Sequence, residues 1–176
     1  MKFLNSTLII VILLGGTVFS ANTLSIAPQA ITPQTTPNYL TIELNLTNSD
    51  TLSGMQIPLD LGLSKLGLQL DSVSFVGSRV EHFYGSFYNV YPEQDKVFIF
   101  ILESADAEIN SSPLLPGSGK IATIYLTSVR ASENDSHEIT NERIEAHRRD
   151  LSFSAWDCHG KEVTLEFVPL GLKVQR

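Results

Sequence analysis

Apolar and polar residues alternate with a period of two over residues 39–75, and this pattern strongly constrains the fold. Between residues 40 and 47 every even-numbered residue is leucine or isoleucine, and every odd-numbered residue is polar. Successive side chains of an extended strand point to opposite faces, so the aliphatic residues share one face. A helix would scatter them around its axis. The segment therefore predicts a β-strand with one buried face.

A second strand follows after a short turn. Ser53 and Gly54 favour the turn, because glycine adopts positive φ and serine bonds to nearby backbone. Apolar residues then occupy the odd positions of residues 55–61. Pro58 lies within this run and cannot donate a backbone hydrogen bond, so we expect an edge strand, or a bulge where Pro58 sits.

Further segments predict an all-β domain. Strands are expected at residues 66–75, 80–91, 97–102 and 121–127. Residues 80–91 are rich in aromatic side chains, and residues 97–102 are apolar on both faces, which suits a central strand. Residues 103–120 form a long connection of the kind that joins two sheets. The charged residues 129–150 predict a solvated loop with one short helix. Residues 151–155 and 163–167 predict a closing hairpin around a turn at 157–160. The expected fold is an antiparallel β-sandwich with jelly-roll topology.

The N-terminus has the form of a secretory signal peptide. Lys2 precedes an apolar run, and small residues follow near residue 20. A membrane anchor is the alternative, but the apolar run is shorter than the roughly 20 residues that span a bilayer. We therefore expect residues 1–20 to be removed, and the mature protein to be secreted, periplasmic or on the cell surface without a membrane span.

The remaining chain predicts a single domain. Residues 21–38 are rich in proline and threonine and indicate a leader, with a short edge strand at residues 24–26. Residues 39–176 then form the sandwich domain. The net charge of −7 disfavours a phosphate backbone as partner, so nucleic acid is excluded. Cys158 is the single cysteine, so an internal disulfide cannot form.

Three stretches resemble cohesin modules, which are secreted jelly-roll domains related to family-3 carbohydrate-binding modules. The paired opening LTIELNLTN (40–48) and SGMQIPLDL (53–61), continued by KLGLQLDSV (65–73), resembles the first strands of that family. KVFIFI (96–101) resembles its central strand. GKIATIYL (119–126) resembles its Gly-x-apolar-Ala-Thr-Ile strand, in which Ala122 permits close packing of two layers.

The resemblance implies a non-catalytic module that binds a dockerin-like protein partner. The Asp-x-Asn-x-Asp-Gly calcium repeat of dockerins is not found in the sequence, so the chain resembles the receptor side of such a pair. Two departures concern the binding surface. Residues 61–63 are Leu-Gly-Leu where many cohesins have Tyr-Asp-Pro, and residues 129–150 have no clear counterpart.

Catalytic and metal sites find little support in the sequence. Glycoside hydrolysis needs two carboxylates held a few ångströms apart, and no feature of the sequence selects one pair of Asp or Glu residues. Glu103, Asp106 and Glu108 follow the expected central strand and indicate a solvated loop. Cys158 beside His159 lacks the further groups that a nucleophile needs, and indicates a turn. We expect no catalytic residue, no metal ligand and no cofactor. A structural calcium ion at residues 106–110 or 132–136 is left open.

The candidate ligand-binding residues lie in the aromatic segment at residues 80–91. A period of two places Tyr84 and Tyr88 on one face and Tyr91 on the other. A flat sheet face presenting Tyr84, Tyr88 or Tyr91 could stack on sugar rings, with Asn89 bonding to hydroxyl groups. Packing of these aromatics in the core is the alternative interpretation. The sequence thus leaves three functions: protein recognition through a sheet face, which the resemblance favours, polysaccharide binding, and a structural role in cell-surface assembly.

Overall fold

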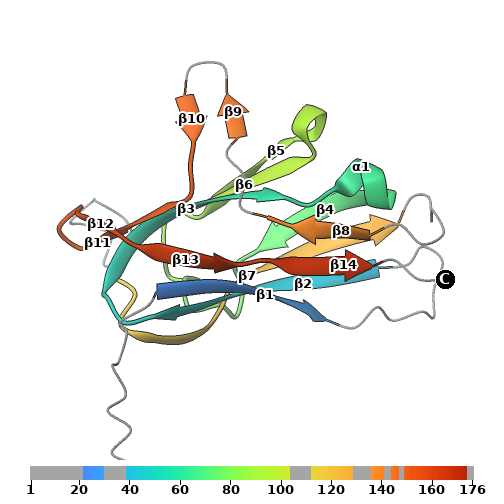
Figure 1. Cartoon of the computed structure of the whole chain (residues 1–176). Coiled ribbons are helices and arrows are strands. Elements are labelled where there is room, and N and C mark those ends of the chain that lie inside the picture. The colour runs from blue at the N-terminus through green and yellow to red at the C-terminus, as the bar shows by residue number, and fades with distance from the viewer. Residues whose placement is uncertain are drawn as a thin grey trace, which may run out of the picture.

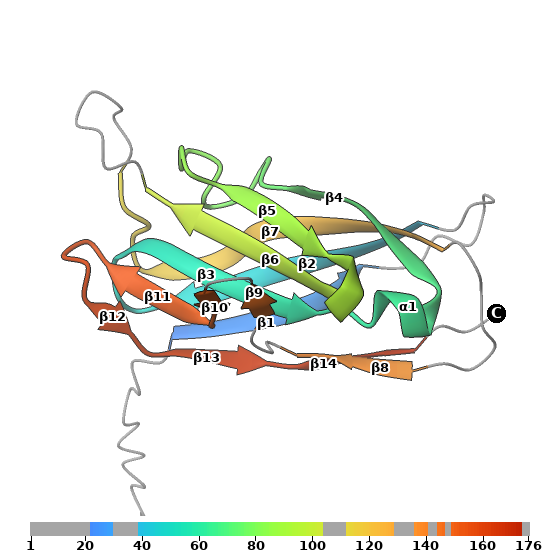
Figure 2. The same cartoon turned by 90° about the horizontal axis from the view of Figure 1, so that it is seen from above.

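The computed structural model describes residues 22–29, 39–103, 112–128, 136–140, 144–146 and 149–173, and these build two β-sheets packed face to face (Figures 1 and 2). Strand pairs are antiparallel, apart from the parallel pair of β1 and β13. The prediction of an all-β antiparallel sandwich is therefore confirmed.

The first sheet has the order β13-β1-β2-β7-β4. Its strands are β1 (Asn22–Gln29), β2 (Tyr39–Asn48), β4 (Leu68–Ser74), β7 (Gly117–Ser128) and β13 (Leu165–Val168). The second sheet has the order β12-β11-β3-β6-β5. Its strands are β3 (Leu52–Asp60), β5 (Phe87–Tyr91), β6 (Lys96–Leu102), β11 (Ser154–Asp157) and β12 (Glu162–Val163).

Short elements complete the fold. Two two-stranded ribbons pair β8 (Ser136–Ile139) with β14 (Leu170–Lys173) and β9 (Ile144–Ala146) with β10 (Arg149–Leu151). The single-turn helix α1 (Leu63–Leu66) and the 3₁₀ turn η1 (Pro92–Gln94) connect strands. The β9–β10 ribbon projects from the sandwich on the side of the second sheet (Figures 1 and 2).

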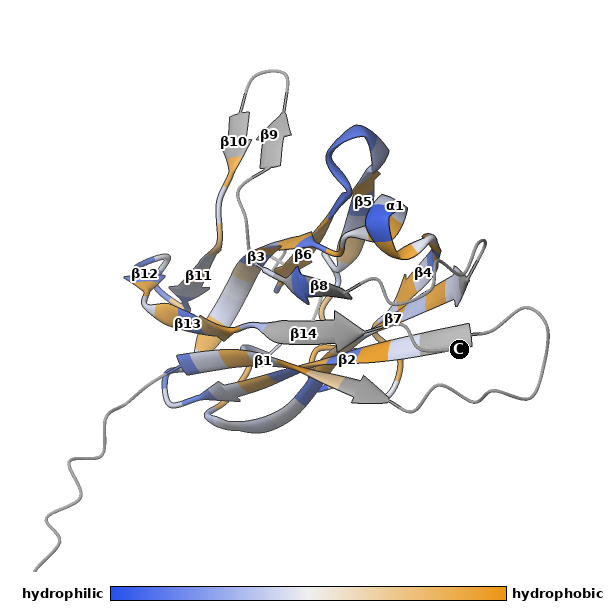
Figure 3. Cartoon of the chain, turned by 45° about the vertical axis from the view of Figure 1, so that its right-hand side comes forward, coloured by the Kyte–Doolittle hydropathy of each residue, from blue (hydrophilic) through white to orange (hydrophobic). Residues whose placement is uncertain are grey.

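The core lies between the two sheets and consists of the side chains that the alternation predicted to be buried. Ile42, Leu44 and Leu46 of β2 face Met55, Ile57, Leu59 and Leu61 of the opposite layer, and all seven are fully buried. Ala122 in β7 is also fully buried. Hydrophobic and hydrophilic bands succeed each other along the strands, as a period of two requires (Figure 3).

The expected edge strand at residues 24–26 is wrong in length and position. β1 covers Asn22–Gln29 and lies between β13 and β2, with Leu24 fully buried. Asn22 explains why the strand starts so early. Its side-chain amide donates to Asp50 Oδ2 (2.8 Å) and to the carbonyl of Thr164 (3.1 Å), while its Oδ1 accepts from the backbone N–H groups of Ser49 and Asp50. Part of the predicted leader is thus a central strand.

Pro58 lies in a central strand rather than an edge strand, because β3 pairs with β6 on one side and β11 on the other. Asp60 donates its N–H to Thr140, and N–H groups alternate sides along a strand, so the nitrogen of Pro58 faces the same way. Pairing with β11 ends at Gln56. The missing donor therefore falls in a gap between Gln56 and Asp60, where no ladder bond is needed.

Three further expectations need correction. Residues 75–86 form turns, so the aromatic segment is a strand only over β5. The charged residues 129–150 contribute β8, β9 and part of β10 where they are described, instead of a helix. The predicted closing hairpin exists as β11–β12, but the chain then crosses to the other sheet, where β13 runs parallel to β1.

Leu44→Ala should lower the free energy of unfolding by about 3 kcal/mol, because it removes packed methyl groups and leaves a cavity between the sheets. Gln69→Ala, at an exposed site in β4, should change it by less than about 0.5 kcal/mol. Urea denaturation followed by circular dichroism measures both values. Equal effects of the two substitutions would contradict the assignment of Leu44 to the core.

Candidate functional site

The central strand β6 is apolar on both faces, as its sequence predicted. Val97, Ile99 and Ile101 point into the core and are fully buried. Phe98, Phe100 and Leu102 alternate with them and therefore lie on the outer face of the second sheet. Leu102 is 38% exposed. The strand thus carries apolar side chains to the surface as well as to the core.

The neighbouring edge strand adds a further phenylalanine to this face. Phe87 of β5 lies opposite Phe100, with ring centroids 5.0 Å apart and ring planes inclined by 37°. The Phe98 ring stacks 6.3 Å from Phe100 at 29°. Phe87 is 46% exposed, whereas Phe98 is 4% exposed, so the cluster runs from a covered base to an open edge. Such aromatic pairs stabilise one another beyond the area they bury.

Gly54 in β3 connects this cluster to a tryptophan. A Cβ atom at position 54 would lie 3.1 Å from Leu102 Cδ1 and 3.2 Å from Trp156 Cε3, so both side chains lie over the glycine. Trp156 of β11 pairs with Gly54 and is half-buried. The apolar surface therefore crosses four strands. We call it the aromatic face, and define it by five residues: Phe87, Phe98, Phe100, Leu102 and Trp156.

The turn after β11 holds Trp156 in place. The Asp157 carboxylate accepts hydrogen bonds from the backbone N–H groups of His159 (2.8 Å) and Lys161 (2.9 Å), and its carbonyl accepts one from the Ser53 hydroxyl (2.6 Å). These bonds stabilise the charged form. The backbone bond from Lys161 contributes most to lowering the pKa of Asp157, and the bond from His159 adds to it.

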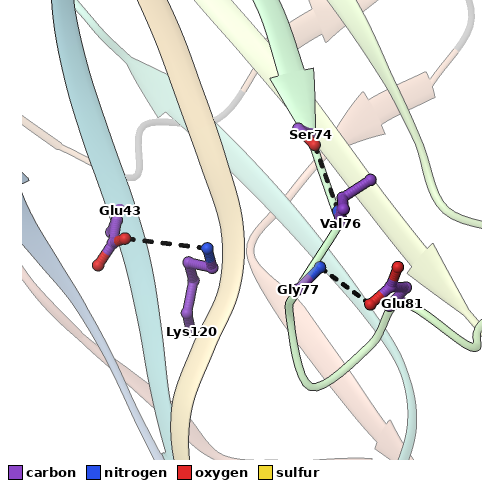
Figure 4. Close-up of polar contacts among 6 residues, drawn as sticks. All are labelled: Glu43, Ser74, Val76, Gly77, Glu81 and Lys120. Atoms are coloured by element: carbon purple, nitrogen blue, oxygen red, sulfur yellow. Dashed lines mark hydrogen bonds and ion pairs between the residues drawn. The ribbon is translucent and has the colours of Figure 1, made fainter.

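The outer face of the first sheet is different in character. Thr41, Glu43 and Asn45 of β2 alternate with the buried leucines and isoleucine and point to solvent. Glu43 and Lys120 form an ion pair of 3.9 Å across β2 and β7 (Figure 4). Tyr125 of β7 is the large apolar side chain exposed on this strand, at 42%. Tyr125 is thus a separate exposed aromatic side chain on this sheet, whereas the aromatic side chains on the outer face of the second sheet lie together in one cluster.

The four predicted ligand-binding residues do not form one platform. Asn89 and Tyr91 lie two residues apart in β5 and share the outer face with Phe87. Tyr88 points the other way and packs against the core. Tyr84 lies in the turns before β5 and is 74% exposed. The shared strand face expected for Tyr84 and Tyr88 is therefore not formed.

Sequence reasoning missed the residues of the aromatic face. The pattern VFIFIL was interpreted as a strand buried on both sides, although the same pattern fits a strand with one apolar face open to a partner. Trp156 carried a clearer signal, because it alternates with the inward-facing Ala155 and so had to point outward. Which strands lie beside β6 depends on long-range pairing, and the sequence alone did not give that order.

Other candidate chemistry is dispersed or lies outside the described residues. Asp106, Glu108 and both calcium candidates fall in undescribed segments, apart from Ser136. Cys158 is exposed in the turn after β11. The described residues contain no group of three or more His, Cys, Asp or Glu residues that could hold a metal ion. Among the same residues, no helix has the length and apolar character needed to cross a membrane.

Comparison with solved structures places this fold among cohesins. A cohesin in a type I cohesin–dockerin complex from Clostridium thermocellum superposes with a TM-score of 0.61 at 16% identity, over 86% of this chain and 99% of that one. The sixth cohesin of scaffoldin B from Acetivibrio cellulolyticus, in complex with a Cel5 dockerin, superposes with a TM-score of 0.61. Its sequence identity is 13%, and the match covers 86% of this chain and 96% of that one.

A type II cohesin domain from the cellulosome of Acetivibrio cellulolyticus gives a TM-score of 0.61 at 12% identity, over 86% of this chain and 95% of that one. No family model and no curated protein matches the sequence. The resemblance inferred from sequence is therefore confirmed as a likeness of fold over most of the chain.

Asp157→Asn should destabilise the protein at pH 7, because a neutral amide oxygen accepts the two backbone hydrogen bonds more weakly than a carboxylate. The folded state lowers the pKa of Asp157, so the wild-type advantage exists above the unfolded pKa of about 3.9. It is lost as the pH falls through the lower folded pKa. Urea denaturation of both proteins between pH 7 and pH 2 measures the difference. A difference that stays constant over this range would contradict the role of the carboxylate.

Proposed function

We propose that this chain, which has the fold of a cohesin, is a non-catalytic exported module that binds a protein partner of the dockerin kind through its aromatic face. The observation that carries the proposal is the contiguous apolar surface from Phe87 to Trp156 on one side of the sandwich, on which Phe87 and Leu102 are exposed and Phe100 and Trp156 are half-buried. Export rests on the signal-peptide form of residues 1–20. The expected location is the cell surface, the periplasm or the medium.

The chemistry of the aromatic face favours a protein partner. Large apolar side chains exposed together are costly in water and are typical of interaction surfaces. Aromatic residues dominate the binding energy of many protein interfaces, with a polar rim around an apolar centre. Here Phe100, Leu102 and Trp156 form the centre, with Gln56 paired to Phe100 beside them, and Phe87 lies at the open edge on β5. Asn89 and Lys96 are polar residues on the outer sides of β5 and β6.

A polysaccharide is less well matched to this surface. Stacking of successive sugar rings requires aromatic planes that are coplanar, whereas the Phe87 and Phe100 rings are inclined by 37°. Phenylalanine also offers no hydroxyl to the sugar, and Tyr88 packs against the core instead of joining the face. The geometry therefore supports protein recognition in preference to carbohydrate stacking.

Phe87→Ser should weaken binding to a dockerin by at least about tenfold, because it removes the most exposed aromatic side chain of the aromatic face. Tyr125→Ser is the matched control, since Tyr125 is 42% exposed on the opposite sheet and Phe87 is 46% exposed. Isothermal titration calorimetry against a panel of purified dockerins measures both affinities. Circular dichroism establishes that each variant remains folded.

Failure of every dockerin in the panel to bind the wild-type protein at micromolar concentration would count against this partner class. Equal losses for the two variants would remove the aromatic face as the binding surface. Retention on insoluble polysaccharides, abolished by Phe87→Ser, would replace the protein partner with a carbohydrate.

A further inference from the structure

A second candidate site lies in an open hollow that none of the aromatic-face residues lines. Its volume is about 600 Å³. The β4–β5 connection contributes Arg79 and His82, and the rest of the wall is the segment before β7, residues 112–116. This combination of one guanidinium with mostly apolar walls indicates a particular kind of ligand.

Arg79 is held rigidly at the hollow. Its Nη1 donates to the carbonyl of Leu46 (3.2 Å) and to Asn48 Oδ1 (2.8 Å), and its Nη2 donates to the carbonyl of Leu115 (2.7 Å). Two glycines make room for the side chain. A Cβ atom at Gly117 would lie 3.1 Å from Nη2, and one at Gly119 would lie 3.0 Å from Cδ. The guanidinium is thus positioned before any ligand arrives.

The charge of Arg79 is not balanced by a carboxylate among the described residues. All three acceptors are neutral, and Glu81 instead accepts a hydrogen bond from the backbone N–H of Gly77 (2.9 Å; Figure 4). Partial burial lowers the pKa of Arg79, which reflects the cost of removing the charge from water. Three of its five N–H groups donate to these acceptors, and the other two have no partner among the residues that the structure describes, so they could donate to an anion.

The walls of the hollow define what the anion is attached to. Pro113, Leu114, Leu115 and Pro116 are apolar, and Leu115 is 66% exposed. A sugar acid would leave its hydroxyl groups unpaired against such walls. At one side of the hollow, His82 donates from Nε2 to the carbonyl of Ser112 (2.9 Å), so this rim is polar. An aliphatic carboxylate with an adjacent amide fits all three features.

We propose that this hollow binds the C-terminus of a peptide whose last residue is aliphatic. The terminal carboxylate pairs with the guanidinium of Arg79, and the last side chain packs on Leu115 and the flanking prolines. Charge complementarity carries the choice of ligand, because a fixed cation that meets no carboxylate within the described part of the chain gains from a bound one. The site is independent of the aromatic face, so the protein would hold two partners, or two parts of one partner.

The test uses the full ¹⁵N-labelled chain and N-acetyl-leucine, a model of a peptide C-terminus. Saturable shifts of the amide resonances of residues 79–82 and 114–117 are expected, with a dissociation constant on the order of 1 mM. N-acetyl-leucinamide, which lacks the charge, should bind at least about tenfold more weakly. 4-Methylpentanoate, which lacks the amide, should bind a few times more weakly than N-acetyl-leucine. Equal binding of the amide would overturn the charge pairing, and equal binding of 4-methylpentanoate would overturn the assignment to a peptide.

Two variants locate the site. Arg79→Gln removes the charge and should abolish the preference for the acid over the amide. Because Arg79 also ties loops together, Leu115→Ser provides a second variant at an exposed wall position, and it should weaken binding about threefold or more. Val76→Ser is the matched control, since Val76 is 72% exposed and does not line the hollow. Unchanged binding by Leu115→Ser, or an equal loss with Val76→Ser, would overturn the proposal.

Discussion

Burial of every second side chain between the two sheets is the constraint on which the rest of the structure depends. Leu44, Ile57 and Ile99 are fully buried in three different strands, and each strand can place its residues inward in only one register. A slip by one residue would expose the apolar set and bury the polar set. The same rule fixes which residues of β5 and β6 point outward, so the core determines the composition of the surface.

The aromatic face depends on this rigidity. Phe100 projects from a strand whose other side is anchored by Ile99 and Ile101, and Trp156 is anchored by Ala155 in the core. Gly54 adds a local condition, because Leu102 and Trp156 meet only where β3 has no side chain. Binding through such a surface needs little reordering of backbone, which reduces the entropic cost of association.

Local patterns in the sequence predicted the strands, and long-range pairing decided the rest. The alternation around Leu44 and Ile57 predicted two strands and their buried faces correctly. It did not predict that Leu24 belongs to a central strand, because the surrounding segment is rich in proline. Contacts of Asn22 with Asp50 and Thr164 hold the start of that strand in the sheet. Tyr84 and Tyr88 were assigned to one face, but turns before Phe87 break the period. Residues of the aromatic face come from four strands, and their juxtaposition follows from sheet order.

Pro58 carries a consequence for how such a domain tolerates change in length. Its missing N–H coincides with an interruption of the ladder between Gln56 and Asp60. The chain segment that lies opposite this part of β3 leaves the sheet here to form β9 and β10. Lengthening or shortening that ribbon would leave the register of β3 with β6 intact, because β6 pairs with the opposite side of β3. A ribbon of another length can therefore be accommodated beside the aromatic face without disturbing the buried layer beneath it.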